Sequence, residues 1–218
     1  MTTTPPAASS DARPAVDMVV RSLFIKGFAM PALLAPAVLT DEAGVRVVLD
    51  RMIADGLAAP KGPMFQLTDA GKARGAELAT LDREQWGVKN AVKALDAFLA
   101  FDHRMKEVVT AWQLRTVGGQ QVMNDHTDPG YDSTVLGDFA RLHADAAAWL
   151  APIPSGLPRI ADYVVRLAHA AEHVAAGEHT YIASPRLDSY HSIWFELHED
   201  LIRLAGRTRE DEVAAGRA

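Results

Sequence analysis

The run Asp188–Asp200 (DSYHSIWFELHED) constrains the fold more than any other segment of this chain. Seven residues make almost two turns of an α-helix, so His191 and His198 lie on one helix face. Trp194 lies between them, where a plain bundle helix would carry leucine or alanine. A buried polar group without a partner costs about 1–3 kcal/mol, so this face requires either a hydrogen-bonded network or a ligand. The run therefore predicts an inward-facing helix that forms one wall of a site.

The ends and edges of this helix can also be predicted. Asp188 or Ser189 is suited to cap its N-terminus, and Gly206 to end it. Phe195 is expected to point inward with the imidazoles. Three charged side chains are expected at the rim of the site: Glu199, Asp200 and Arg203. The residues that follow, 207–218, are expected to form a charged, frayed tail.

Composition excludes several classes of protein. Hydrophobic residues make up 49% and charged residues 23% of the 218 residues, which is typical of a globular protein able to bury a core. The absence of cysteine excludes disulfides, thiolate nucleophiles and thiolate metal sites, and fits a reducing cytoplasm. Residues 1–15 are small, polar and proline-rich, and predict a disordered tail rather than a signal peptide. The apolar run 29–39 is too short to cross a bilayer, so we expect a cytoplasmic protein without membrane contact.

The charge distribution argues against a strong nucleic-acid binder. Acidic and basic side chains balance over residues 1–90, and the net charge of −6 comes from the remainder. Neither part has the basic excess that neutralising phosphates requires.

Residues 16–88 carry the order of elements typical of a winged helix-turn-helix domain. Apolar periodicity predicts three helices, the third capped by Thr40. Two short strands follow around a turn at residues 60–63, and Thr68 is placed to cap a fourth helix. The junction between Asp55 and Gly71 (DGL…F.LTDAG) resembles that of the MarR-like transcription regulators.

DNA binding by this domain is possible but disfavoured. A recognition helix presents its N-terminal residues to base edges and phosphates. The corresponding positions here carry two acidic residues, Asp41 and Glu42, followed by Arg46 and Asp50, and the wing offers only Lys61. Carboxylates repel phosphates, so a protein-docking or purely structural role is favoured.

Residues 89–206 predict an α-helical bundle, which makes the chain mainly α. One face of its first helix starts apolar and continues through Asp102, Lys106 and Gln113. This change predicts a polar pocket at one end of the bundle. The alternative is an ordinary ion pair between Asp102 and Lys106 in solvent, which contributes about 0.3–0.5 kcal/mol.

The connection over residues 117–131 is rich in hydrogen-bonding side chains. Asn124, Asp125 and His126 fall within it. They are either one wall of a site or a solvated loop, since Asn, Asp and Gly are common turn formers.

Histidines on two further helices lead to different expectations. His143 lies in the apolar stripe of a helix expected over 135–150, as a satisfied core residue or as a ligand-binding group. His169 and His173 have the i,i+4 spacing that can chelate zinc. They are expected on a solvated face beside Asp162 and Arg166, so no metal site is expected there.

The predicted ligand-binding residues are nine, and we expect them to converge on one partly wet cavity. Lys106 would offset an anionic group, imidazoles and amides would orient the ligand, and Trp194 would form an apolar wall. No cofactor and no metal is expected, and catalytic residues are unknown. The nine are Lys106, Gln113, Asn124, Asp125, His126, His143, His191, Trp194 and His198.

Four segments together resemble a known module. They are WQLR (Trp112–Arg115), NDHTDPGYD (Asn124–Asp132), LHADAAAWL (Leu142–Leu150) and the long run Ser184–Glu212. They resemble the C-terminal helical module, preceded by a winged-helix-like segment, of some bacterial pyruvate, phosphate dikinase-like proteins. The resemblance extends over nearly everything after the N-terminal tail.

The resemblance implies an accessory role. The ATP-binding domain, the TSHAA-like phosphohistidine motif and the barrel of a dikinase have no counterpart here, so no catalytic residue carries over. A free-standing accessory module would bind a small molecule and dock on a phosphoenolpyruvate- or ATP-utilising partner. One alternative is a MarR-like, ligand-responsive transcription regulator. Another is an enzyme that uses a His/Glu acid–base pair or a metal, although no kinase, nucleophile-elbow or phosphate-loop motif occurs.

Overall fold

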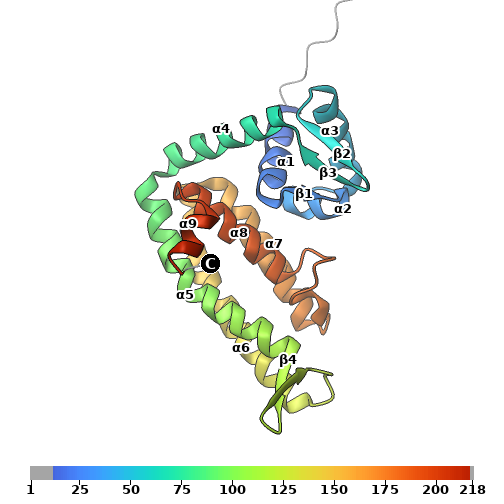
Figure 1. The fold of residues 1–218 in the computed structure, drawn as a ribbon, viewed down its shortest axis with the longest axis vertical. Helices are drawn as coiled ribbons and strands as arrows, with labels where there is room; N and C mark the ends of the chain where they lie inside the picture. Colours follow the sequence, from blue (N-terminus) through green and yellow to red (C-terminus); the bar gives the residue numbers. More distant parts are fainter. Residues whose placement is uncertain (1–11, 217–218) are drawn as a thin grey trace, which may run out of the picture. The chain divides into compact units, whose positions relative to one another are not determined.

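The computed structural model describes residues 12–216, and it is mainly helical with two small sheets (Figure 1). The chain divides into two compact units at Leu81/Asp82, ahead of the boundary expected near residue 88. Most of the tail expected over 1–15 lies outside the described residues, although the first helix already begins at Ala12. None of the helices in the described range combines the length and apolar character needed to cross a bilayer.

The first unit contains helices around a three-stranded antiparallel sheet of order β1-β3-β2. Strand β3 pairs with both neighbours, with Phe28 opposite Gln66 and Ala58 opposite Leu67. Its elements are α1 (Ala12–Lys26), β1 (Phe28–Ala29), α2 (Pro31–Leu34), the 3₁₀ turn η1 (Pro36–Val38), α3 (Glu42–Ala54), β2 (Ala58–Lys61), β3 (Met64–Leu67) and the start of α4 (Asp69–Trp86).

Local chemistry explains the helix ends of this unit. Thr68 Oγ1 accepts a hydrogen bond from Gly71 N at 3.1 Å, as the capping prediction requires. A Cβ atom on Gly71 would lie 2.0 Å from the Leu57 carbonyl oxygen, so only glycine fits at this junction. The expectation that Thr40 caps α3 was wrong. Asp41 is the cap, and its carboxylate accepts from Gly44 N at 2.7 Å.

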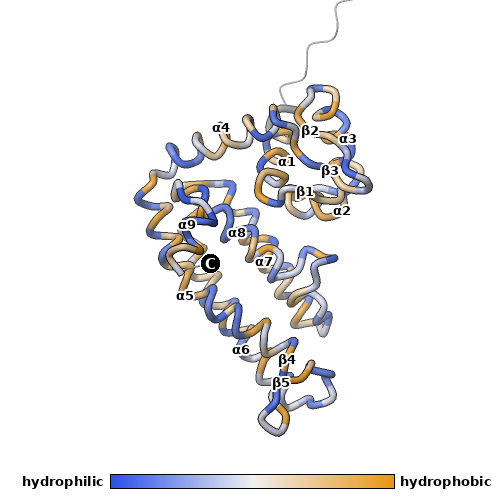
Figure 2. The backbone as a smooth tube through the Cα atoms, viewed as in Figure 1, coloured by the Kyte–Doolittle hydropathy of each residue, from blue (hydrophilic) through white to orange (hydrophobic). Residues whose placement is uncertain are grey.

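The second unit is bundle-like. Helix α5 contacts α6 and α8, and α7 contacts the same two helices, so the four close around a common core. Figure 2 shows hydrophobic and hydrophilic residues alternating along these helices, as expected for amphipathic segments. Its elements are α5 (Val88–Gln113), β4 (Leu114–Val117), β5 (Gln120–Met123), α6 (Pro129–Leu150), η2 (Ile153–Ser155), η3 (Pro158–Ile160), α7 (Ala161–Ala175), η4 (His179–Tyr181), α8 (Tyr190–Leu204) and α9 (Arg209–Ala214).

Two predicted irregular segments are ordered. The β4–β5 hairpin occupies much of the expected loop, and α6 begins at Pro129, where the Asp128 carboxylate accepts from two backbone amides. The tail after Gly206 is not frayed over its described part. Thr208 and Asp211 form a reciprocal capping box on α9, and the fully buried Glu212 carboxylate pairs with Arg207 Nη1 at 3.2 Å.

The charged positions of α7 and α8 differ most from the sequence expectation. Arg166, expected in solvent, is buried and binds Asp188 and Glu196 at 2.6 Å and 3.0 Å. Asp200, expected at a rim, is buried and accepts from Arg159 and from the Tyr163 hydroxyl. Paired charges can be buried because each partner replaces the water that the other loses.

The two other rim residues differ from one another. Glu199 is also buried, where it pairs with Arg209 Nε at 3.3 Å and with Arg203 Nη2 at 2.8 Å. Arg203 itself is partly exposed. Phe195, expected inside, is 50% exposed and lies beneath the Arg209 guanidinium. The buried face of α8 therefore includes Glu199 and Asp200, whereas Phe195 lies outside it.

Candidate functional site

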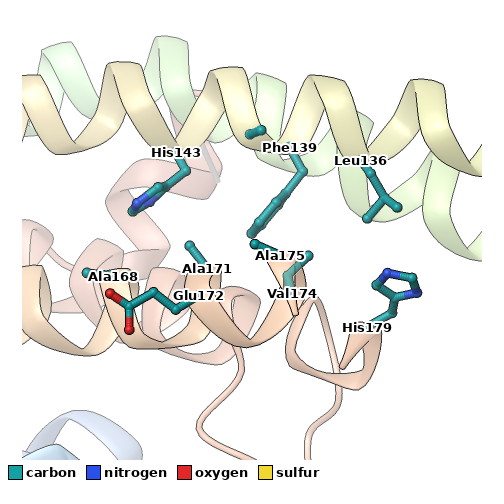
Figure 3. A pocket seen from close by; sticks show the side chains of 10 residues that line it. Leu136, Phe139, His143, Ala168, Ala171, Glu172, Val174, Ala175 and His179 are labelled. Carbon is teal, nitrogen blue, oxygen red and sulfur yellow. The ribbon is translucent and has the colours of Figure 1, made fainter. Parts of the chain in front are cut away.

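A cavity of about 480 Å³ lies between α6 and α7 (Figure 3). Its volume falls within the range of small-molecule sites. Three polar side chains line it: His143, Glu172 and His179. The remaining lining is apolar and consists of Leu136, Phe139, Ala140, Ala168, Ala171, Val174 and Ala175.

The space exists because α7 presents alanine to α6. Ala168, Ala171 and Ala175 recur at helical spacing and share the face toward the cavity. Larger apolar side chains at these positions would fill the gap to protein-like packing density. The cavity therefore depends on a stripe of alanines. Helical periodicity identifies this stripe as apolar but does not show that its small side chains leave a space.

His143 is the predicted site residue that lines this cavity. Its Nδ1 atom lies 3.3 Å from the hydroxyl of Tyr190, which is fully buried on α8. Burial lowers the pKa of His143, with the negative charge of Glu172 acting in the opposite direction. Burial also raises the pKa of Tyr190, so its phenol keeps its proton. A fully buried hydroxyl needs an acceptor, and Nδ1 is the atom that it contacts, so we infer that the hydroxyl donates to Nδ1 and that the neutral imidazole carries its proton on Nε2.

Trp194 and His198 lie behind Tyr190 in dense aromatic packing and do not line this cavity. The Trp194 ring stacks on Phe98 at 4.7 Å between centroids, and His198 lies against the same phenyl ring at 4.7 Å. His198 Nε2 is buried without a hydrogen-bond partner among residues 12–216. Neither ring lines the cavity, because both pack against Phe98.

Asp102 connects the remaining candidates on α5 and α8. Its carboxylate accepts from Trp194 Nε1 at 3.1 Å and pairs with Lys106 Nζ at 3.0 Å. Burial lowers the pKa values of His191 and His198, and the charge of Asp102 opposes the shift in each. The i,i+4 ion pair forms, with Asp102 buried and Lys106 exposed, and neither residue lines the cavity.

The predicted residues of the connection form a second polar cluster. Asn124 is buried and donates to Asp132 at 2.8 Å, and His126 Nδ1 lies 3.0 Å from the other oxygen of that carboxylate. The Trp112 ring contacts both His126 and His179, with centroids 4.3 Å and 5.1 Å away. His179 lines the cavity, so this cluster reaches the end of it.

The nine predicted residues thus fall into three groups. His143 lines the cavity, and Asn124 and His126 approach its end through Trp112. His191 is half-buried near Asp102, and Trp194 and His198 are core residues. The exposed remainder is Lys106, Gln113 and Asp125, of which Asp125 pairs with Arg115 at 2.7 Å.

Sequence reasoning missed Tyr190, Glu172 and His179. No sequence pattern marked Glu172 as a site residue, because His143, which shares the cavity with it, lies on another helix. Tyr190 could have been suspected, since a tyrosine in the first turn of a buried helix needs a partner for its hydroxyl.

The lining limits the chemistry of the cavity. It contains an imidazole donor and a carboxylate at one end, and no lysine or arginine. No cluster of three or more His, Asp or Glu side chains in the described part of the chain has metal-holding geometry. The arrangement suits binding of an apolar molecule that presents an acceptor to His143 and a donor or cation to Glu172.

Comparison of the chain with protein-family models, with curated proteins and with solved structures gave no match.

Proposed function

We propose that this chain is a small-molecule-binding accessory subunit whose ligand occupies the cavity between α6 and α7. The observation that carries the proposal is an apolar cavity of about 480 Å³ with the His143 imidazole and the Glu172 carboxylate at one end. Apolar walls provide affinity, and a few polar groups fix the orientation of the ligand.

The ligand is neutral or cationic rather than anionic. The role considered for Lys106, offsetting an anion, has no support at this cavity, because Lys106 pairs with Asp102 elsewhere on α5. A second cavity of about 340 Å³ between α5 and α6 does contain Arg104 and Arg141. These arginines pair with Asp145 and Asp138. Neither cavity offers an uncompensated positive charge.

The test compares two probes with the same apolar body, 2-naphthylmethylamine and 2-naphthoate. Isothermal titration should show the amine binding at least about fivefold more tightly, which corresponds to about 1 kcal/mol of attraction to Glu172. Ala171→Phe should abolish binding by filling the cavity, whereas Ala148→Phe on the exposed face of α6 should not. The proposal would be contradicted if the wild type bound the two probes equally and Ala171→Phe bound them as tightly as the wild type does.

We further propose that the partner is a phosphoenolpyruvate-utilising, dikinase-like phosphotransferase. Support comes from the resemblance of the four segments quoted above. The first unit is the proposed docking part, since α3 exposes Val47 and Ile53. Its arginines are paired locally, Arg46 with Glu42 and Arg51 with the C-cap residue Asp55. A pull-down from native lysate should recover a phosphoenolpyruvate- or ATP-utilising protein. Val47→Asp should lose it, and its absence with wild-type bait would refute this partner.

The second candidate is a ligand-responsive transcription regulator. The specific support is the β1-β3-β2 sheet, in which the β2–β3 hairpin follows α3 as the wing follows a recognition helix in a winged helix-turn-helix domain. It predicts a salt-sensitive shift of promoter DNA flanking the gene. Unchanged DNA mobility at low salt would remove this candidate.

A further inference from the structure

His169 and His173 form a pair on the flank of α7, outside the cavity. Their Nε2 atoms lie 3.1 Å apart, and the ring centroids are 4.4 Å apart. His169 is exposed and His173 is partly exposed, so the pair is accessible. The i,i+4 spacing alone predicts such proximity. The orientation of the rings does not follow from the spacing.

That orientation is set by neighbours of His173. Its Nδ1 atom lies 2.9 Å from the Glu178 carboxylate, and its ring stacks on Tyr181 at 4.1 Å with an interplanar angle of 7°. A carboxylate accepts only, so Nδ1 carries the proton and the Nε2 lone pair of His173 faces His169. Carboxylate–histidine pairs of this kind orient metal-binding imidazoles and increase their basicity.

The separation of the two nitrogens fits a bound metal ion. With metal–nitrogen bonds of about 2.0–2.1 Å and an angle of about 90–110°, two ligand nitrogens lie about 2.9–3.4 Å apart. The observed 3.1 Å falls within this range. Without metal, His169 Nε2–H donates to His173. On binding, the His169 proton moves to Nδ1, so no net proton is released.

We propose that His169 and His173 chelate one divalent transition-metal ion, with water in its remaining coordination positions. Imidazole ligands suit Cu²⁺, Ni²⁺ and Zn²⁺, and the affinity is highest for Cu²⁺. With two protein ligands the ion exchanges readily and keeps open positions. The site goes beyond the proposed binding function and does not depend on it. Tyr181 and the cavity residue His179 share the short turn η4, so the ion also fixes the turn at one end of the cavity.

The experiment titrates Cu²⁺, and separately Zn²⁺, into the full-length chain without a polyhistidine tag. Calorimetry and the electron paramagnetic resonance of Cu²⁺ should show one site with nitrogen ligation. His169→Ala and His173→Ala should each weaken binding at least tenfold. His103→Ala, which removes another exposed histidine paired with a glutamate, should leave it unchanged.

Glu178→Gln tests the orienting carboxylate. Losing such a partner lowers metal affinity by about 10–100-fold. We expect at least a tenfold loss while both imidazoles and the circular dichroism spectrum are retained. Cu²⁺ affinity that is equal in the wild type, His169→Ala and His173→Ala would overturn the proposal. Equal loss in His103→Ala would also overturn it, because binding would then be spread over surface histidines.

Discussion

The hydroxyl of Tyr190 lies 3.3 Å from Nδ1 of His143 and joins α8 to α6. Tyr190 has no exposed surface, so its donor must be satisfied inside the protein. The contact fixes which nitrogen of His143 can donate into the cavity. A core residue thereby determines the polarity of the proposed ligand.

Tyr190→Phe removes this donor and should release the tautomer of His143. We expect a change from one tautomer, protonated at Nε2, to a mixture of both, measured by ¹⁵N chemical shifts of the imidazole. The free energy of unfolding should fall by about 1 kcal/mol. Tyr181→Phe is the control and should leave the His143 shifts unchanged. A wild-type imidazole protonated mainly at Nδ1 would refute the assignment.

Asp102→Asn removes a charge while keeping an oxygen that can accept from Trp194 Nε1. Because the Asp102 charge opposes the burial effect at His191 and His198, both pKa values should fall further in the variant. Nuclear magnetic resonance titration of the imidazole protons measures this. Asp145→Asn, at an exposed ion pair of α6, should shift neither. Unchanged titration in Asp102→Asn would show that its charge does not reach the imidazoles.

Stability should decrease as the pH falls below about 6.5, the ordinary pKa of histidine. Burial lowers the pKa values of His143, His191 and His198, so the unfolded chain binds more protons in this range. Each contributes stability above its unfolded pKa and loses it as the pH falls through its folded pKa. The slope has an upper limit of about 1.4 kcal/mol per pH unit for each histidine, which solvent screening reduces.

Urea denaturation at pH 7.5 and 5.5 measures this slope. His143→Gln should flatten it, and His103→Gln at an exposed position should not. A midpoint that stays constant over this pH interval would disprove the contribution of the buried imidazoles.

Arg166→Ala should be among the most destabilising single substitutions in the second unit. It leaves the carboxylates of Asp188 and Glu196 without their shared cation, at a cost of about 3–5 kcal/mol. Denaturant unfolding provides the measurement, with the exposed Arg141→Ala as control. Neutralising both acids in Arg166→Met/Asp188→Asn/Glu196→Gln should recover much of the loss. A cost below 1 kcal/mol for Arg166→Ala would contradict the burial of this network.

Helical periodicity and capping preferences correctly predicted the features that depend on residues close together in the sequence. The main helices, the Thr68 cap and the Ser189 cap agree with the structure, since each depends on residues within one or two turns. The prediction that Arg166 lies on a solvent-exposed face of α7 was wrong, because a helical wheel places every charged side chain in solvent. Its partners Asp188 and Glu196 lie on later segments, and their pairing could not be seen in the spacing.

The candidate site was predictable to a similar extent. His143 stood out because an imidazole interrupts an apolar stripe. The hydroxyl that orients it comes from another helix, and the cavity beside it depends on which alanines face one another. Trp194 and His198 stood out for the same reason as His143, yet Phe98 packs against both. Sequence periodicity identifies unusual residues but cannot determine whether a ligand or a neighbouring ring fills the space beside them.

Trp112, in contact with both His126 and His179 at the end of the cavity, gives the chain an intrinsic optical reporter. An imidazole that moves or gains charge beside an indole changes its emission. The fluorescence of the unlabelled protein should therefore respond to an occupant, against a steadier background from the other three indoles, Trp86 and Trp194 in the core and Trp149 packed against it.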